Sequence, residues 1–330
     1  MPGLVNTHTH LAMTLLRGFS DDKNLHEWLE KDIFPMETIL TEEDIFLGAR
    51  LGAVESALAG VTTVNTMYHS AHKEAEALKS VGLRGVVGEV CFSGEKDEDI
   101  RLTEELIQGY HGSFNGLIRV SVDPHAAYTT DLELIQSLKQ LIEHYNSKFV
   151  PAKIPPLFWH MHTAETSSES QTTKNHLIAM YGEEKAKELM PGTSIFEYLS
   201  NIGMLNTNEA SIPFVAAHCV SLEEKDIAIL KTHDIGVASN PVSNLKLASG
   251  VAPVPRLRSE NINVGIGTDS AASNNSLDCF DSLRIMALIH KGVTKDPLAI
   301  SARDAVAMAT SLGAKILGFQ DLGAIRNGFL

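Results

Sequence analysis

The chain has 330 residues, of which 44% are hydrophobic and 21% are charged, an ordinary globular composition with enough apolar residues for a large core. Aspartate and glutamate number 41 against 27 lysines and arginines, so the formal net charge is −14. This balance disfavours nucleic-acid binding, which needs a basic surface, and is easier to reconcile with a small neutral or cationic substrate.

Cys91, Cys219 and Cys279 are widely spaced and form no CxxC pair. A disulfide framework or a cysteine zinc site is therefore not expected, and a reducing compartment fits. The N-terminus shows no basic segment followed by a long apolar run, and no stretch approaches the ~18 apolar residues of a membrane-spanning helix. We expect a cytoplasmic protein that neither enters a membrane nor binds nucleic acid. The sequence leaves open whether it forms a homo-oligomer.

Short apolar runs typical of β-strands recur along the chain, at 3–7, 62–67, 84–90, 117–122, 157–162, 213–218, 235–239 and 263–268. Amphipathic stretches alternate with them, at 41–58, 131–145, 221–232, 277–291 and 302–317. The clearest is 41–58, where Thr41 and Asp44 match a capping box and Gly60 follows as a stop signal. The proline-rich segment 146–156 is expected to be a loop, and 166–192 a polar excursion with one helical piece around 183–189.

Eight strands alternating with helices indicate a parallel sheet, and eight is the number that closes a (β/α)8 barrel. Several of the runs, such as 214–217, are continuously apolar, as expected of strands covered on both faces. A doubly wound open sheet is the competing architecture, but no glycine-rich phosphate loop follows the first strand. We therefore predict a single (β/α)8 barrel domain over residues 1–330.

Two histidines, His8 and His10, stand one residue apart at the end of the first predicted strand. Residues i and i+2 of a strand share a face, so the two imidazoles suit a metal ion. His162, His218 and Asp269 also follow strand ends, which is where barrel active sites lie. This pattern predicts a metallohydrolase. His160 would share the strand face of His162 one layer deeper, but only His162 has a glutamate, Glu165, three residues further on.

These motifs resemble the amidohydrolase superfamily. The segments that carry the resemblance are PGLVNTHTH at 2–10, HTAET at 162–166, AHC at 217–219, SNP at 239–241 and GTDS at 267–270. Within the superfamily, MTLLRG at 13–18, NLKL at 244–247 and AASNN at 271–275 resemble the 5-methylthioadenosine/S-adenosylhomocysteine deaminases and their triazine chlorohydrolase relatives. The resemblance covers essentially the whole chain.

The resemblance implies one divalent metal ion, usually zinc with iron or manganese as alternatives, held by His8, His10, His162 and Asp269. Glu165 would pass a proton to the purine ring nitrogen beside the carbon under attack. Asp269 would accept the proton of the attacking hydroxide, which His218 would orient. The implied reaction is hydrolytic deamination of an adenine nucleoside (methylthioadenosine, S-adenosylhomocysteine, 5′-deoxyadenosine or adenosine) to an inosine-type product and ammonia.

Further positions match substrate contacts of these deaminases: Glu37 the ribose hydroxyls, His125 the nucleoside and Arg101 the tail of the substrate. From the residues alone, Glu37 and Arg101 resemble exposed helix charges, whereas His125 lies just past the fourth strand. Glu89 stands near the place where homocysteine-accepting members have an arginine. Because an acid repels the carboxylate of a homocysteine tail, we expect the tail-free nucleosides to be preferred over S-adenosylhomocysteine.

Three alternatives stay open: a deaminase of guanine or another aminoheterocycle, a triazine chlorohydrolase, and a non-catalytic barrel. Glu37 and His125 favour a nucleoside, since a ribose-free substrate has no hydroxyls for Glu37 to bind. The complete set of metal-ligand candidates and Glu165 disfavour a non-catalytic scaffold. Members of the family also carry a small β-sandwich built from segments beyond both ends of the barrel. That sandwich is expected to be largely missing here.

Overall fold

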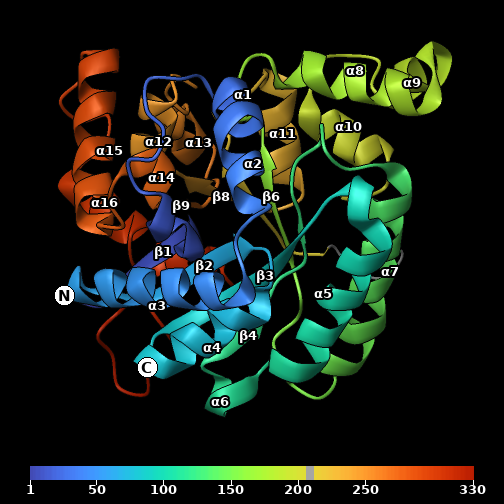
Figure 1. Ribbon diagram of the computed structural model, residues 1–330. Helices are drawn as coiled ribbons and strands as arrows, with labels where there is room; N and C mark the ends of the chain where they lie inside the picture. Colours follow the sequence, from blue (N-terminus) through green and yellow to red (C-terminus); the bar gives the residue numbers. More distant parts are fainter. Residues whose placement is uncertain (206–211) are drawn as a thin grey trace.

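The wall of a barrel is built from two sets of parallel strands in the computed structural model, which describes residues 1–205 and 212–330 (Figure 1). In the first set the strand order is β10-β1-β2-β3-β4, with β5 also paired to β3; in the second it is β6-β7-β8-β9. The bounds are β1 Leu4–His10, β2 Val61–Tyr68, β3 Arg84–Cys91, β4 Ile118–Val120, β5 Asp123–Pro124, β6 Trp159–Thr163, β7 Phe214–His218, β8 Gly236–Ser239, β9 Val264–Ile266 and β10 Asp269–Ser270.

The two sets join along both edges, so the barrel is closed. On one side, parallel bridges at Val122–Trp159 and Ala126–His162 connect the fourth strand position to β6. On the other side, β9 of the second set continues along the chain into β10, which pairs in parallel with β1. The eight predicted strands are all present, although the fourth and eighth positions are each split into two short strands. The prediction of a (β/α)8 barrel is confirmed.

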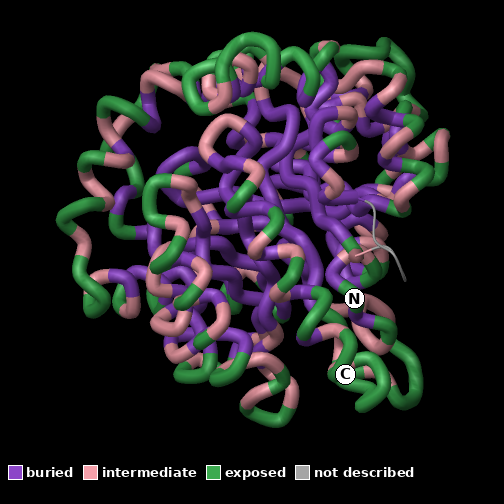
Figure 2. The backbone as a smooth tube through the Cα atoms, turned by 90° about the vertical axis from the view of Figure 1, so that its right-hand side faces the viewer, coloured by how far each residue is buried: buried purple, intermediate pink, exposed green. Residues whose placement is uncertain are grey.

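Helices surround this wall, and Figure 2 shows the buried strands in the centre with the exposed backbone at the periphery. The outer helices are α3 Glu42–Leu58, α4 Ala71–Val81, α5 Lys96–Tyr110, α7 Leu132–Phe149, α11 Glu224–Thr232, α15 Cys279–Thr294, α16 Ala302–Met308 and α17 Ser311–Ile316. Shorter helices occupy the connections: α1 Leu25–Trp28, α2 Phe34–Glu37, α6 Ser113–Gly116, α8 Glu169–Tyr181, α9 Glu183–Leu189, α10 Ile195–Asn201, α12 Pro241–Lys246, α13 Val254–Ser259 and α14 Ala271–Asn274. Turns of other helix types span Leu11–Leu16, Leu29–Ile33 and Ser93–Glu95. No helix in the described parts of the chain is long and apolar enough to cross a membrane.

Three sequence expectations about helices need correction. Helix α7 continues to Phe149, so the loop expected from residue 146 begins later, where Pro151 cannot donate a helical hydrogen bond. The amphipathic stretch 302–317 is two helices, because Thr310 between them has the non-helical angles φ −135° and ψ −97°. The excursion 166–192 contains α8 as well as the expected α9.

The predicted capping box of α3 is confirmed and carries a stability prediction. The Thr41 hydroxyl accepts a hydrogen bond from the Asp44 amide at 3.2 Å, and the Asp44 carboxylate accepts one from the Thr41 amide at 2.9 Å. Thr41→Ala removes the first of these and should lower the free energy of unfolding by about 1 kcal/mol. Denaturant titration measures the loss, with Thr41→Ser as the control that keeps the cap. An alanine variant with an unchanged midpoint would contradict the assignment.

The interior of the barrel beneath its open end is polar. Such interiors are usually filled by branched aliphatic side chains. Here Asn6, His8, Asp123 and His160 are all 0% exposed, and they include side chains that contact one another across the barrel. A polar interior of this kind indicates a functional site at the open end of the barrel above it.

Candidate metal and active site

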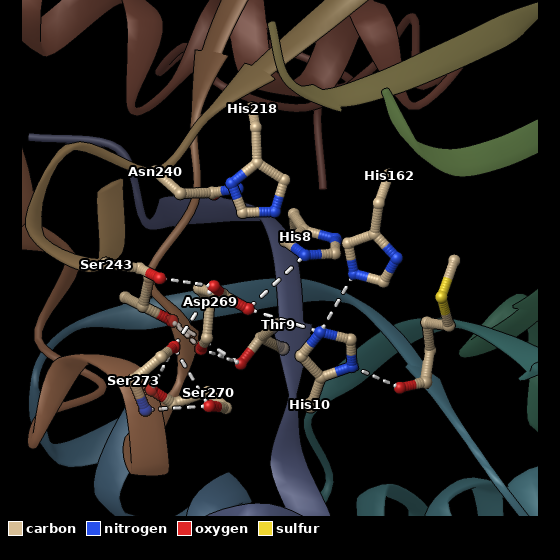
Figure 3. A network of polar contacts seen from close by, with 12 residues as sticks. His8, Thr9, His10, His162, His218, Asn240, Ser243, Asp269, Ser270 and Ser273 are labelled. Carbon is tan, nitrogen blue, oxygen red and sulfur yellow. Dashed lines mark hydrogen bonds and ion pairs between the residues drawn. The ribbon is translucent and has the colours of Figure 1, made fainter. Parts of the chain in front are cut away.

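The structure brings His8, His10, His162, His218 and Asp269 together at the carboxyl ends of the strands (Figure 3). The Asp269 Oδ1 atom lies 3.4 Å from His8 Nε2 and 3.2 Å from His10 Nε2. The Nε2 atoms of His10 and His162 are 3.2 Å apart. The rings of His8 and His218 have centroids 5.3 Å apart. Four strands that are far apart in sequence therefore direct ligand atoms at a common point. Strand β1 contributes two nitrogen atoms, and β6, β7 and β10 contribute one nitrogen or oxygen atom each.

Each of the four imidazoles uses its Nδ1 atom for a separate contact. The pairs are His10 Nδ1 with Met67 O at 2.6 Å, His162 Nδ1 with His125 O at 2.9 Å, His218 Nδ1 with Asn244 Oδ1 at 2.8 Å and His8 Nδ1 with His160 Nε2 at 2.8 Å. A carbonyl or amide oxygen at Nδ1 fixes the proton on that nitrogen. The Nε2 lone pair is then left for a cation.

Two of the convergent atoms lack the hydrogen-bond partners that buried polar atoms normally have. The Nε2 atoms of His8 and His218 are buried and have no hydrogen-bond partner among the described residues. An unsatisfied buried polar atom costs about 1–3 kcal/mol. Three imidazole nitrogens and one carboxylate oxygen are a donor set suited to a divalent transition metal such as zinc. The residues present therefore fit such an ion.

Local backbone geometry at two strand ends turns the side chains into the mouth. His218 has φ 73° and Asp269 has φ 60°, both in the left-handed region that non-glycine residues rarely occupy. Such conformations cost about 1–3 kcal/mol each and recur at functional sites. The second carboxylate oxygen of Asp269 accepts hydrogen bonds from Ser243 Oγ at 2.6 Å and Ser273 Oγ at 3.1 Å. Its Oδ1 atom is thereby directed at the imidazoles.

The two carboxyl groups of the site have opposite pKa shifts. Burial disfavours the charged form of Asp269, but contacts with His10 and His8 outweigh it and hold its pKa well below the usual value. Burial, with the nearby charge of Asp269, raises the pKa of Glu165 well above its usual value. Glu165 Oε1 lies 3.6 Å from His218 Nδ1. A lowered pKa at Asp269 favours its ionised form and a raised pKa at Glu165 favours its protonated form, the pairing that acid–base chemistry uses.

A pocket opens above these residues and holds two more of the predicted site residues. Its walls include Glu37, at the end of α2, and His125, just past β5, and it contains about 580 Å³ of empty space including its mouth. The apolar lining comes largely from the segment around α1 and α2 and comprises Met13, Leu25, Trp28, Leu29, Ile33, Phe34, Met67, Val90, Phe92 and Leu247.

His125 is held in this wall as a neutral ring. Its imidazole stacks on Phe92 with centroids 4.6 Å apart, and its Nδ1 atom lies 2.9 Å from Thr129 Oγ1. Burial lowers the pKa of His125 to about 3. A neutral imidazole offers a hydrogen bond to a nucleoside without placing a positive charge in the pocket.

Two residues that the sequence suggested for the substrate's tail lie outside the pocket wall. Arg101 is exposed on α5, where its guanidinium pairs with Glu98 and Glu105. Glu89 is 2% exposed, and its carboxylate accepts hydrogen bonds from the Ser70 and Ala71 amides, both at 2.8 Å. The carboxylate thus binds the first amides of α4 and does not face a ligand. The expected repulsion between Glu89 and a homocysteine tail is therefore wrong.

Sequence reasoning also missed residues that support the site. Ser243, Ser273 and Asn244 orient Asp269 and His218, and they lie within or beside the SNP, NLKL and AASNN segments already noted. Glu169 accepts hydrogen bonds from the Ala164 amide at 3.0 Å and the Glu165 amide at 2.6 Å, which fixes the turn after β6. The spacing of four residues between Glu165 and Glu169 could have indicated that the two side chains lie close together.

Comparisons with known proteins agree with this geometry. The profile described as the amidohydrolase family matches residues 1–330. A 5-methylthioadenosine/S-adenosylhomocysteine deaminase of Dictyoglomus thermophilum is 40% identical over 332 aligned residues, which cover 100% of this chain and 71% of that protein. A 5′-deoxyadenosine deaminase of Methanocaldococcus jannaschii is 38% identical over 334, covering 100% and 73%. The crystal structure of an adenosine deaminase from Xanthomonas campestris with bound zinc has a TM-score of 0.84 at 33% identity, covering 100% of this chain and 70% of that one.

Proposed function

The chain belongs to the amidohydrolase family, and we propose that it is a metal-dependent deaminase that hydrolyses the adenine amino group of a nucleoside to an inosine-type product and ammonia. One observation carries this proposal. The metal-ligand candidates His10, His162 and Asp269 line the same pocket as two acids, Glu165 and Glu37. The names of the relatives, which include deaminases of methylthioadenosine, S-adenosylhomocysteine and 5′-deoxyadenosine, support the same reaction class.

The metal ligands we propose are His8, His10, His162 and Asp269, and the proposed ion is zinc. When bound, the cation would supply a water nucleophile at neutral pH by lowering the pKa of that water. His218 lies beside the same point with its Nε2 lone pair unpaired, because its Nδ1 proton is held by Asn244. That lone pair accepts a hydrogen bond from the attacking water and so fixes its direction.

Proton movements in the proposed reaction are carried by the two carboxyl groups. Glu165 donates a proton to the ring nitrogen beside the carbon that carries the amino group, which makes that carbon more electrophilic. Asp269 accepts a proton from the attacking oxygen. When the carbon–nitrogen bond breaks, Asp269 gives the proton it took to the leaving amine, which departs as ammonia. The remaining hydroxyl proton returns to Glu165 as the carbonyl of the product forms. One water is consumed and one ammonia released, so the atoms balance.

Glu37 is proposed to bind the two ribose hydroxyls, at the side of the pocket formed by α2. Hydrogen bonds to a charged group contribute about 1.5–3 kcal/mol, so Glu37→Gln should raise KM for adenosine by about 10- to 100-fold. The change in kcat should be small, since Glu37 does not touch the reacting carbon. Steady-state kinetics with adenosine and 2′,3′-dideoxyadenosine measure this. An equal loss for both substrates would refute a hydroxyl contact.

A substrate panel tests the function itself. Purified protein loaded with zinc is assayed for ammonia release from methylthioadenosine, S-adenosylhomocysteine, 5′-deoxyadenosine, adenosine and guanine, and for product formation from a chlorotriazine. Deamination of at least one nucleoside supports the proposal. Activity confined to guanine or the triazine, or activity with none of the six, contradicts it.

A further inference from the structure

A chain of three buried side chains runs beneath the proposed metal site. His8 Nδ1 lies 2.8 Å from His160 Nε2, and His160 Nδ1 lies 3.0 Å from Asp123 Oδ2. All three residues are 0% exposed. They belong to β1, β6 and β5, so the contacts cross the barrel interior. We propose that Asp123 and His160 are positioning residues that orient His8 as a metal ligand, an inference that rests on the metal-dependent function proposed above.

The direction of the hydrogen bonds follows from what a metal ligand must do. A neutral imidazole has one N–H and one lone pair, and a ligating His8 must present its Nε2 lone pair. Its proton therefore sits on Nδ1 and is donated to the Nε2 lone pair of His160. The proton of His160 must then sit on Nδ1, where it is donated to Asp123. His8 and His160 are in this way each limited to one tautomer, because the carboxylate of Asp123 at the end of the chain accepts hydrogen bonds and donates none.

His8 differs in this respect from the other imidazoles of the site. The Nδ1 atoms of His10 and His162 meet main-chain carbonyls, and that of His218 meets an amide oxygen. The Nδ1 atom of His8 alone among these four has a second imidazole as its hydrogen-bond partner, and that imidazole contacts the carboxyl group of Asp123. A carboxylate behind an imidazole raises its basicity as a ligand, and linked hydrogen bonds strengthen one another in a buried setting.

The fold keeps a specific space for the carboxylate. A Cβ atom built on Gly88 of β3 would lie 2.0 Å from Asp123 Oδ2, so no larger residue fits beside it. Asp123 Oδ1 is buried and has no hydrogen-bond partner among the described residues. Burying a carboxyl group with one unpaired oxygen costs free energy. This cost favours a role for the contact between Asp123 and His160 over simple packing. A purely structural core would fill this layer with aliphatic side chains.

We call the hydrogen-bonded chain of His8, His160 and Asp123 the relay. Measurements of zinc affinity test its role. Competition with a chromophoric chelator gives the dissociation constant of each purified variant. His160→Leu removes the acceptor of the His8 proton and should weaken zinc binding by about 10- to 100-fold, the usual effect of losing such an outer partner. His160→Gln, whose amide oxygen still accepts, should recover most of this loss. Asp123→Asn and Gly88→Ala should also weaken binding, by removing the charge and by displacing the carboxylate.

Two controls separate the relay from a general packing effect. His290→Leu removes another buried imidazole, 3% exposed on α15, and should leave zinc affinity unchanged. The visible spectrum of the cobalt-substituted protein reports ligand geometry and should change in His160→Leu but revert toward wild type in His160→Gln. If His160→Leu does not fold, the comparison of His160→Gln with Asp123→Asn carries the test. Equal zinc affinity in wild type, Asp123→Asn and every folded His160 variant overturns the relay, whereas a wild-type protein that binds no zinc overturns the proposed function.

Discussion

Replacing Glu165 with glutamine is expected to lower kcat/KM for a nucleoside substrate by about 100-fold or more, while the metal content stays at the wild-type level. The side chain keeps its size, but it no longer holds the proton that the purine ring must receive. Its neighbour His218 and the charge of Asp269 remain in place. Steady-state kinetics and elemental analysis of the same preparation measure both quantities.

Glu89→Gln is the matched control for this prediction. It neutralises another buried glutamate, but one whose carboxylate contacts the first amides of α4 and lies outside the pocket wall. Its turnover should stay near wild type even if its stability falls. Wild-type turnover in Glu165→Gln would remove Glu165 from the reaction, and a loss of metal in that variant would make it a ligand instead.

Removing the metal is expected to abolish deamination and to lower the melting temperature. Without a cation, the Nε2 atoms of His8 and His218 stay unsatisfied, and those of His10 and His162 face each other at 3.2 Å. A ligand present at 100 times its dissociation constant stabilises the folded state by about 2.7 kcal/mol. Dialysis against a chelator, followed by activity and calorimetric measurements, tests both effects.

Restoration completes this experiment. Zinc added to the dialysed protein should return activity and melting temperature together, whereas magnesium, which prefers an octahedral set of oxygen ligands, should return neither. Full activity in protein shown by elemental analysis to be metal-free would contradict the assignment of His8, His10, His162 and Asp269 as ligands.

The strands and the converging residues could be predicted because both depend on local spacing. An apolar run followed by a histidine places that histidine at a strand end, and parallel strands in a barrel bring such ends together. The same i, i+2 spacing placed His160 one layer below His162, which is where it lies. Its contacts could not be predicted because its partners, His8 and Asp123, are 152 and 37 residues away in sequence.

Predictions that depended on side-chain surroundings succeeded less often. The position of Glu89 along β3 was compatible with a pocket, but its carboxylate turns toward the amides of α4. Arg101 has carboxylates three and four residues away on its own helix and pairs with them. The break at Thr310 depends on main-chain angles that the amphipathic pattern does not encode. Sequence spacing predicts where a strand ends and which face a residue occupies. It predicts less well which partner a side chain binds.

The pairing of β1 with β10 has a consequence for how the protein assembles itself. The first proposed ligands are residues 8 and 10 and the last is residue 269, and the two segments meet only when the final strand docks on the first. During synthesis the chain must extend beyond residue 269 before the metal site exists, so the early part of the barrel emerges from the ribosome without it. Because closing so long a loop is costly in entropy, we expect this pairing to form late in folding. A bound metal would then slow unfolding, because it holds β1 and β10 together. It would change the rate of folding much less.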